Sequence, residues 1–170
     1  DSIFSSMSNP APFLSVVIPV YNEEENVALL YEGLKRSLAD RGFGWELIFV
    51  NDGSTDNSVK VLADLAHKDI SVKYMVLTRN FGQQAALTAG MDYARGNYIV
   101  TMDCDLQDPP EMVPAMIEKA KEGYEVVFAR RAFRDESFFK RATASLYYKL
   151  LEKFSDTEVY GNIGDFRLIT

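Results

Sequence analysis

Residues 14–24, LSVVIPVYNEE, decide the fold, because a β-branched apolar run passes directly into a polar loop. Residues 14–18 are typical of a buried strand. The stretch that follows, from about residue 24 to 39, repeats apolar residues at helical spacing: Val27, Leu30, Leu34 and Leu38. A buried strand followed by an amphipathic helix is the repeating unit of a parallel α/β sheet.

The same unit recurs along the rest of the chain. Apolar runs predict further strands at residues 45–50, 72–77, 98–102, 125–129 and 166–169. Helical spacing and end signals predict helices at about 56–66, 83–94, 109–121 and 137–154. In this interpretation Ser54 or Asp56 caps the second helix, and Gly96 ends the third. The alternation predicts the α/β class, with a mostly parallel sheet and helices on both faces.

Composition narrows the classes of protein that fit. The 170 residues are 47% hydrophobic and carry a net charge of −7, which suits one globular domain and argues against a nucleic-acid partner. Cys104 is the single cysteine, so no intrachain disulfide can form and a reducing compartment fits. No apolar run reaches the roughly 18 to 20 residues of a membrane span. Residues 1–12 are Ser-rich, and we expect a disordered lead or an expression remnant before a domain at 13–170.

Four polar loops follow the first four predicted strands, at residues 19–24, 51–56, 78–83 and 103–108. The carboxyl ends of parallel strands lie at one edge of the sheet, where ligands of such folds bind. We therefore expect these loops to form one site. Motifs of the dinucleotide-binding and P-loop types are absent from the sequence, which argues against an oxidoreductase or a P-loop NTPase.

The sharpest local signal is the pair Asp103 and Asp105. At i and i+2 of an extended segment both carboxylates point to one side, and Gln107 continues the spacing. Such oxygen ligands suit Mg²⁺ or Mn²⁺ shared with substrate phosphates. The alternative is a solvated acidic turn. Cys104 lies between the two carboxylates and should point away, into the core.

The other loops have both a structural and a functional interpretation. Asp52 begins a tight turn, and its carboxylate could also accept hydrogen bonds from a nucleobase imide or a ribose hydroxyl. Asn22 and Glu23 suit a helix N-terminus, while Tyr21 could stack on a base. Arg79 lies in a loop that is either ordinary or places a cation near a nucleotide.

Together these stretches resemble family 2 glycosyltransferases, in particular the polyprenyl-phosphate sugar transferases. That group includes dolichol-phosphate mannose synthase and the bacterial undecaprenyl-phosphate glucosyltransferases. The resemblance extends from about residue 14 to 168 and rests on these segments: 17–24, 50–56, 79–82, 102–111, 137–141 and 164–168. It implies a GT-A (Rossmann-like) fold and an inverting transfer from a UDP- or GDP-sugar to a polyprenyl phosphate, with Mg²⁺ or Mn²⁺.

The resemblance also implies roles for individual residues. Those expected at the metal and diphosphate are Asp103, Asp105 and Gln107. Those expected at the donor nucleotide are Pro19, Tyr21, Glu23, Asp52 and Arg79, together with Asp103. Those expected to be catalytic are Asp105, Arg131 and Asp165, with Arg131 near the acceptor or donor phosphate.

A lipid monophosphate acceptor is mostly a dianion at neutral pH, so it needs cationic positioning more than proton removal. A basic cluster after the predicted strand at 125–129 fits that need: Arg130, Arg131, Arg134, Lys140 and Arg141. Its alternative is a solvated basic face. Likewise, the apolar face of residues 137–154 suits either a membrane interface or an ordinary core.

Relatives of this type usually continue into membrane helices. We therefore expect a catalytic domain truncated before C-terminal membrane helices, which acts at the cytoplasmic side of the cell membrane, with an oligomer possible. Two other functions stay open at this point. One is transfer to a carbohydrate hydroxyl in cell-surface polysaccharide synthesis, and the other is a nucleotide-sugar-binding module without turnover.

Overall fold

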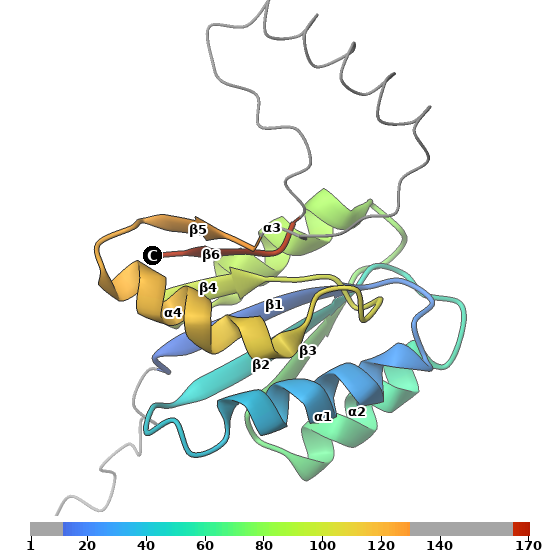
Figure 1. Cartoon of the computed structure of the whole chain (residues 1–170). Coiled ribbons are helices and arrows are strands. Elements are labelled where there is room, and N and C mark those ends of the chain that lie inside the picture. Colours follow the sequence, from blue (N-terminus) through green and yellow to red (C-terminus); the bar gives the residue numbers. More distant parts are fainter. Residues whose placement is uncertain (1–11, 130–164) are drawn as a thin grey trace, which may run out of the picture.

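The computed structural model describes residues 12–129 and 165–170. Within them, six strands form one sheet in the order β3-β2-β1-β4-β6-β5 (Figure 1). The strands are β1 Leu14–Val20, β2 Trp45–Asn51, β3 Val72–Val76, β4 Tyr98–Thr101, β5 Val126–Phe128 and β6 Arg167–Ile169. Strands β1 to β4 pair in parallel, and β6 is antiparallel to both of its neighbours, β4 and β5. The predicted mostly parallel α/β sheet is confirmed.

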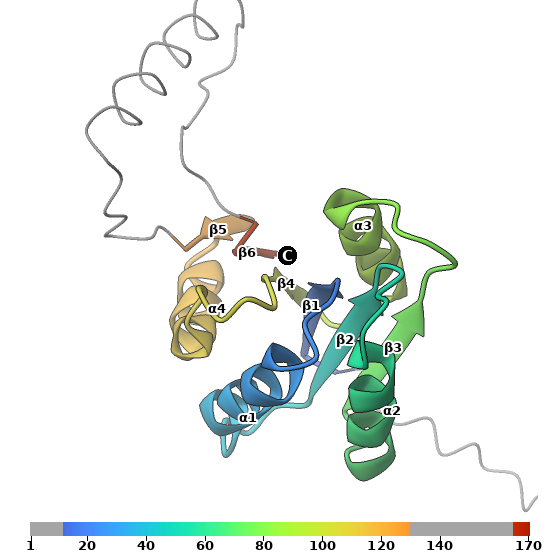
Figure 2. The same ribbon diagram turned by 90° about the vertical axis from the view of Figure 1, so that its right-hand side faces the viewer.

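Helices cover both faces of this sheet. Helices α1 (Asn26–Leu38), α2 (Ser58–Lys68) and α4 (Val113–Lys121) lie on one face, and α3 (Gln83–Tyr93) lies on the other (Figure 2). A short 3-10 turn, η1 (Pro110–Met112), leads into α4. Because side chains alternate along each strand, Val16 and Ile18 of β1 enter the larger core under α1, while Val17 packs beneath α3.

Two glycines allow close packing against strand β1, one within α3 and one just after it. A Cβ at Gly90 would lie 2.3 Å from Val17 Cγ1, so only glycine allows α3 to approach the sheet this closely. Gly96 was predicted to end the helix, but α3 ends at Tyr93 and Ala94 is already extended. Gly96 instead meets β1, where a Cβ would lie 2.5 Å from the Ser15 nitrogen. Its role is close packing of two backbone segments.

A polar cluster between α1 and β3 predicts how stability depends on pH. Burial raises the pKa of Asp69, but hydrogen bonds from Ser71, Tyr31 and Lys35 outweigh it and lower the pKa to about 2. A carboxylate with a lowered pKa stabilises the fold above its unfolded pKa of about 3.9, and this contribution is lost as the pH falls towards 2. The contribution is on the order of 2 kcal/mol.

We therefore expect Asp69→Asn to lower the free energy of unfolding at pH 7, by about 1 to 2 kcal/mol. The difference from wild type should shrink between pH 4 and pH 2, because the wild-type carboxylate also loses its charge there. Urea denaturation across this range measures the difference directly. A gap between the two proteins that stays constant down to pH 2 would show that Asp69 is not the titrating group.

Candidate active site

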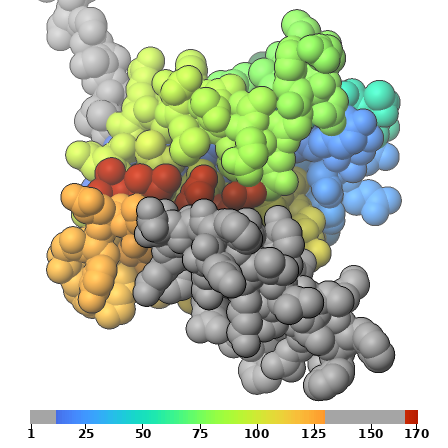
Figure 3. All heavy atoms as spheres, turned by 90° about the horizontal axis from the view of Figure 1, so that it is seen from above, coloured from blue at the N-terminus to red at the C-terminus, as the bar shows by residue number. Residues whose placement is uncertain are grey.

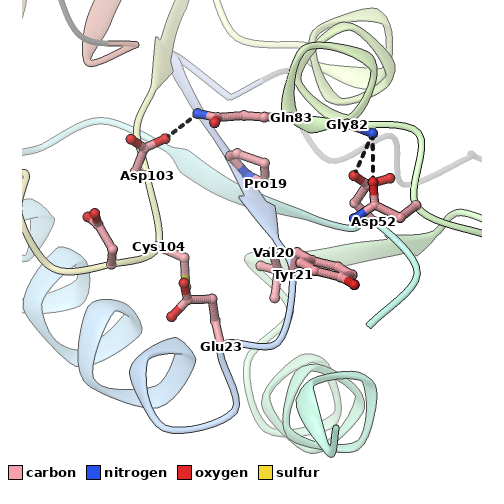
Figure 4. A pocket seen from close by; sticks show the side chains of 11 residues that line it. Pro19, Val20, Tyr21, Glu23, Asp52, Gly82, Gln83, Asp103 and Cys104 are labelled. Atoms are coloured by element: carbon pink, nitrogen blue, oxygen red, sulfur yellow. Dashed lines mark hydrogen bonds between the residues drawn. The ribbon is translucent and has the colours of Figure 1, made fainter. Parts of the chain in front are cut away.

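A cavity of about 300 Å³ opens at the carboxyl ends of β1, β2 and β4 (Figure 4). All four polar loops contribute to it, as the sequence analysis expects. The residues that line it are Pro19, Val20, Tyr21, Glu23, Asp52, Asn80, Gly82, Gln83, Asp103, Cys104 and Asp105. Its size is at the lower end of the range for small-molecule pockets.

The loop after β1 is fixed to the loop after β2. Asn22, in a left-handed conformation at φ 55°, donates from its backbone to Ser54 Oγ at 2.9 Å. Its side chain accepts from the Thr55 nitrogen at 2.8 Å. Asn22 therefore does not cap α1, which begins at Asn26. This cross-link holds the chain at Tyr21, whose ring is about half exposed at the cavity.

Asp52 is buried and shapes the loop before α3. Its Oδ1 accepts from the Phe81 nitrogen at 2.7 Å, and its Oδ2 accepts from the Gly82 nitrogen at 2.9 Å. Asp56, not Asp52 or Ser54, accepts from the first backbone nitrogen of α2, that of Ser58, at 3.0 Å. The Asp52 carboxylate is thus both a cavity wall and an anchor for residues 81–82.

Replacing Asp52 with asparagine should break one of the two hydrogen bonds that its carboxylate accepts. The new amide group would face one of two backbone N–H donors, which leaves that donor unpaired at a cost of about 1 to 3 kcal/mol. We expect a loss of this size in the free energy of unfolding. Asp64→Asn, at an exposed position of α2, is the matched control and should stay within about 0.5 kcal/mol of wild type. Equal stability of the two variants in urea denaturation would contradict the anchoring role.

The loop after β4 differs from the extended geometry that the sequence predicted. Strand β4 ends at Thr101, and the chain then turns through Leu106, whose φ is 62°. The Gln107 nitrogen donates to Asp105 Oδ1 at 3.0 Å, closing the turn. Asp103 and Asp105 nevertheless both line the cavity.

Cys104 lies at the inner wall between the two aspartates and is almost completely buried. Burial raises the pKa of its thiol to about 12, and the nearby charges of Glu23, Asp105 and Asp103 act in the same direction. A protonated thiol is a poor metal ligand. This position fits the expected core role of Cys104.

The described residues fit one kind of metal site and not another. They contain no group of three or more His, Cys, Asp or Glu side chains that could hold a metal ion. A closed structural site is therefore not formed by this part of the chain. The carboxylates of Asp103 and Asp105 suit a hard ion that keeps water and substrate phosphates as its other ligands.

Asp165 is distant from Asp103 in the sequence, but a side chain of α3 contacts both residues. Gln83 Nε2 donates to Asp103 Oδ1 at 2.6 Å and to Asp165 Oδ2 at 3.0 Å, and Gln84 Nε2 donates to Asp165 Oδ2 at 3.2 Å. Thr101, at the end of β4, donates to the backbone oxygen of Asp165. Figure 3 shows residues 165–170 at the surface between the α3 side and the β5 side.

Gln83 and Gln84 were not among the predicted site residues. Their signal in the sequence is their position where the polar loop 78–83 passes into the next helix, at the same sheet edge as the aspartates. Gln83 also lines the cavity, and Figure 4 shows its side chain pointing to Asp103 across Pro19. These glutamines are the functional candidates that sequence reasoning missed.

Three predicted site residues that the structure describes are not part of the cavity lining: Arg79, Gln107 and Asp165. Asp165 lies beside the cavity, where it contacts Gln83. The Arg79 guanidinium lies 4.4 Å from the centroid of the Phe81 ring, which directs it along the loop. Arg131 lies outside the described residues, as do the rest of the basic cluster and the segment 137–154.

The sheet order, the helices on both faces and an Asp-rich cavity at the carboxyl strand ends define a GT-A-like glycosyltransferase domain. A model of the family described as glycosyl transferase family 2 matches residues 15–170, and the chain belongs to this family.

The chain is similar to curated glycosyltransferases from bacteria. The uncharacterized glycosyltransferase YkcC of Bacillus subtilis (strain 168) is 51% identical over 91% of this chain and 48% of its own length. A prophage bactoprenol glucosyl transferase homolog of Escherichia coli (strain K12) is 40% identical over 92% of this chain and 52% of its own length. The chain spans about half the length of these relatives.

A solved structure shows the same fold. Glucosyl-3-phosphoglycerate synthase of Mycobacterium tuberculosis, in complex with Mn²⁺, UDP and glucosyl-3-phosphoglycerate, superposes with a TM-score of 0.67. The match covers 94% of this chain and 57% of that one, at 18% identity. In the described part of this chain, no helix has the length and apolar character needed to cross a membrane.

Proposed function

We propose that this chain forms the donor-binding domain of an inverting glycosyltransferase that moves a sugar from a UDP- or GDP-sugar to a polyprenyl phosphate. The observation that carries the proposal is the cavity itself, where Asp103 lies opposite Tyr21 and Asp52 (Figure 4) and Asp105 also lines the wall. Relatives that are about 40% identical and are named bactoprenol glucosyl transferases support the lipid acceptor.

The donor nucleotide would lie along the wall formed by the loops after β1 and β2. The half-exposed Tyr21 ring offers a flat face to a base, and Pro19 continues the same apolar wall. Each oxygen of Asp52 accepts one backbone N–H, and a carboxylate oxygen has a second lone pair for a donor on the nucleoside. Glu23, from the loop after β1, also lines the cavity.

Asp103 and Asp105 would hold Mg²⁺ or Mn²⁺, which neutralises the charge that grows on the departing nucleoside diphosphate. Mn²⁺ in a solved structure of the same fold supports this assignment. Gln107 and Arg79 would reach the diphosphate only after rearranging, because neither lines the cavity as it stands. We infer that Asp103 and Asp105 carry the main role.

The acceptor phosphate would attack the anomeric carbon from the face opposite the diphosphate, which inverts the configuration. A phosphate dianion needs no base, so the Asp165 carboxylate would serve to orient the reacting groups beside Asp103. Arg131 and the neighbouring basic residues would hold the acceptor phosphate. Since a polyprenyl phosphate is a lipid, the whole protein would work at a membrane surface, on its cytoplasmic side, as a monomer or an oligomer.

A second function has one observation in its favour. Asp165 lies within hydrogen-bond reach of Gln83, which also lines the cavity, so its carboxylate could act as a general base toward a sugar hydroxyl. This arrangement would suit transfer to a carbohydrate in cell-surface polysaccharide synthesis. The names of the 40%-identical relatives favour the lipid phosphate.

A thermal-shift screen of UDP, GDP and their sugars tests donor binding, with and without Mn²⁺. Binding to the folded state alone raises the melting temperature in proportion to ln(1 + [L]/Kd). We expect one nucleotide class to raise the melting temperature clearly and only when Mn²⁺ is present. No shift with any of these ligands at millimolar concentration would contradict the proposed function.

A further inference from the structure

We propose that Gln83 is a positioning residue that couples the metal-side carboxylate, Asp103, to the carboxylate at the chemistry, Asp165. This inference rests on the proposed function. It assigns a role to the first turn of α3 that neither the sequence motifs nor the family description contains. The role follows from a single amide group that contacts two carboxylates from segments far apart in the sequence, one just after β4 and one just before β6.

The chemistry of the glutamine side chain suits this task. Its NH₂ group carries two hydrogens, so one nitrogen can donate to two acceptors at once. Ionised carboxylates are acceptors only, and Asp103 Oδ1 and Asp165 Oδ2 lie 2.6 and 3.0 Å from Gln83 Nε2. The opposite orientation of the amide would place Gln83 Oε1 against two anionic oxygens, so the carboxylates themselves fix the amide.

The residues on either side of the Gln83 contacts are themselves held by hydrogen bonds. The Gly82 nitrogen, next in the chain, is held by the buried Asp52 carboxylate at 2.9 Å, which fixes where α3 begins. Asp165 is also held through its backbone oxygen by Thr101 and through its carboxylate by Gln84. Gln83 donates to both Asp103 and Asp165. Gln84 reaches Asp165 alone, so it provides a matched comparison.

The coupling has two measurable consequences. A hydrogen-bond partner of a metal ligand orients that ligand, and losing it typically costs about 10- to 100-fold in metal affinity. A charge-assisted hydrogen bond to Asp165 holds this carboxylate in place, and at an exposed position its loss should cost about 10-fold in kcat. One substitution should therefore weaken the metal site and slow turnover, through two different carboxylates.

The experiment compares Gln83→Met, Gln83→Glu and Gln84→Met in the full-length protein. Mn²⁺ affinity is measured calorimetrically with UDP or GDP present, whichever binds in the screen, and kcat is measured at saturating Mn²⁺. Gln83→Met should lower Mn²⁺ affinity about 10-fold and kcat about 10-fold, with the donor KM changed less than about 3-fold. Gln83→Glu, which adds a negative charge beside two others, should lower kcat further. Gln84→Met should leave Mn²⁺ affinity within about 2-fold of wild type.

A double-mutant cycle then tests whether Gln83 acts on kcat through Asp165. In an Asp165→Asn background, Gln83→Met should lower kcat by less than about 2-fold. Asp92→Ala, at an exposed position in the last turn of α3, controls for general effects on the helix. Multiplicative losses in the double mutant, or a Gln83→Met variant that behaves like Gln84→Met, would overturn the inference. A wild-type protein that neither binds nucleotide with Mn²⁺ nor turns over would instead overturn the proposed function, and the inference with it.

Discussion

Asp105→Ala should lower the Mn²⁺-dependent affinity for nucleoside diphosphate by at least about 100-fold, which is about 2.7 kcal/mol. In the proposed site Asp103 and Asp105 are the two carboxylates that hold the ion, so the variant would lose one of these two ligands. The melting temperature without ligand should change little, because the Asp105 side chain accepts one exposed hydrogen bond, from the Gln107 nitrogen.

The matched control for this variant is Glu111→Ala. Glu111 is an exposed acidic residue in η1, outside the cavity lining, so its removal changes the net charge equally without touching the site. Isothermal titration with UDP or GDP, with and without Mn²⁺, measures the effect. An Asp105→Ala variant that binds nucleotide as tightly as the Glu111→Ala control would show that the metal assignment is wrong.

Asp165→Asn should lower kcat by about 100-fold while the donor KM changes little. The loss should be the same from about pH 6.5 to pH 8.5, because in the proposed reaction the phosphate acceptor needs no proton removed and Asp165 would orient groups rather than act as a base. Initial rates of sugar transfer across this pH range, at saturating donor, measure both quantities. Loss of activity that is relieved as the pH rises would favour a base role for Asp165 and a hydroxyl acceptor.

The repeating strand and helix pattern was predictable because it depends on local spacing. Residues 14–20 are buried on both faces of the sheet, so they form a continuous apolar run that is readily recognised. The polar residues after β1, β2 and β4 were predictable for the same reason, since the carboxyl ends of parallel strands meet at one edge. These two rules together predict the sheet edge at which the cavity lies.

The connection between Asp103 and Asp165 was not predictable in the same way. It depends on β6 inserting antiparallel between β4 and β5, a pairing between segments far apart in the sequence. Only the resemblance predicted that Asp165 is near the reacting groups, and it did not indicate which residues Asp165 contacts. Gln83 could not be recognised as a connecting residue until the position of Asp165 was known.

Local geometry accounts for the remaining differences. The turn at Leu106 ends the extended register that would have aligned Gln107 with Asp103 and Asp105. The Arg79 side chain is directed by a favourable stacking contact with the Phe81 ring. The position of Arg79 in the motif therefore did not predict where its guanidinium lies. In both cases the backbone conformation or a ring contact decides the outcome, and neither is visible in residue spacing.

A transfer assay with two acceptors in competition tests the proposed reaction directly. The full-length protein would receive labelled sugar nucleotide of the class that binds, Mn²⁺, a short-chain polyprenyl phosphate and a free glycan. We expect label in the lipid phosphate fraction, with kcat falling on the acid side near an apparent pKa of about 6, the second pKa of the acceptor phosphate. Label in the glycan and none in the lipid phosphate would rule out the lipid phosphate as acceptor.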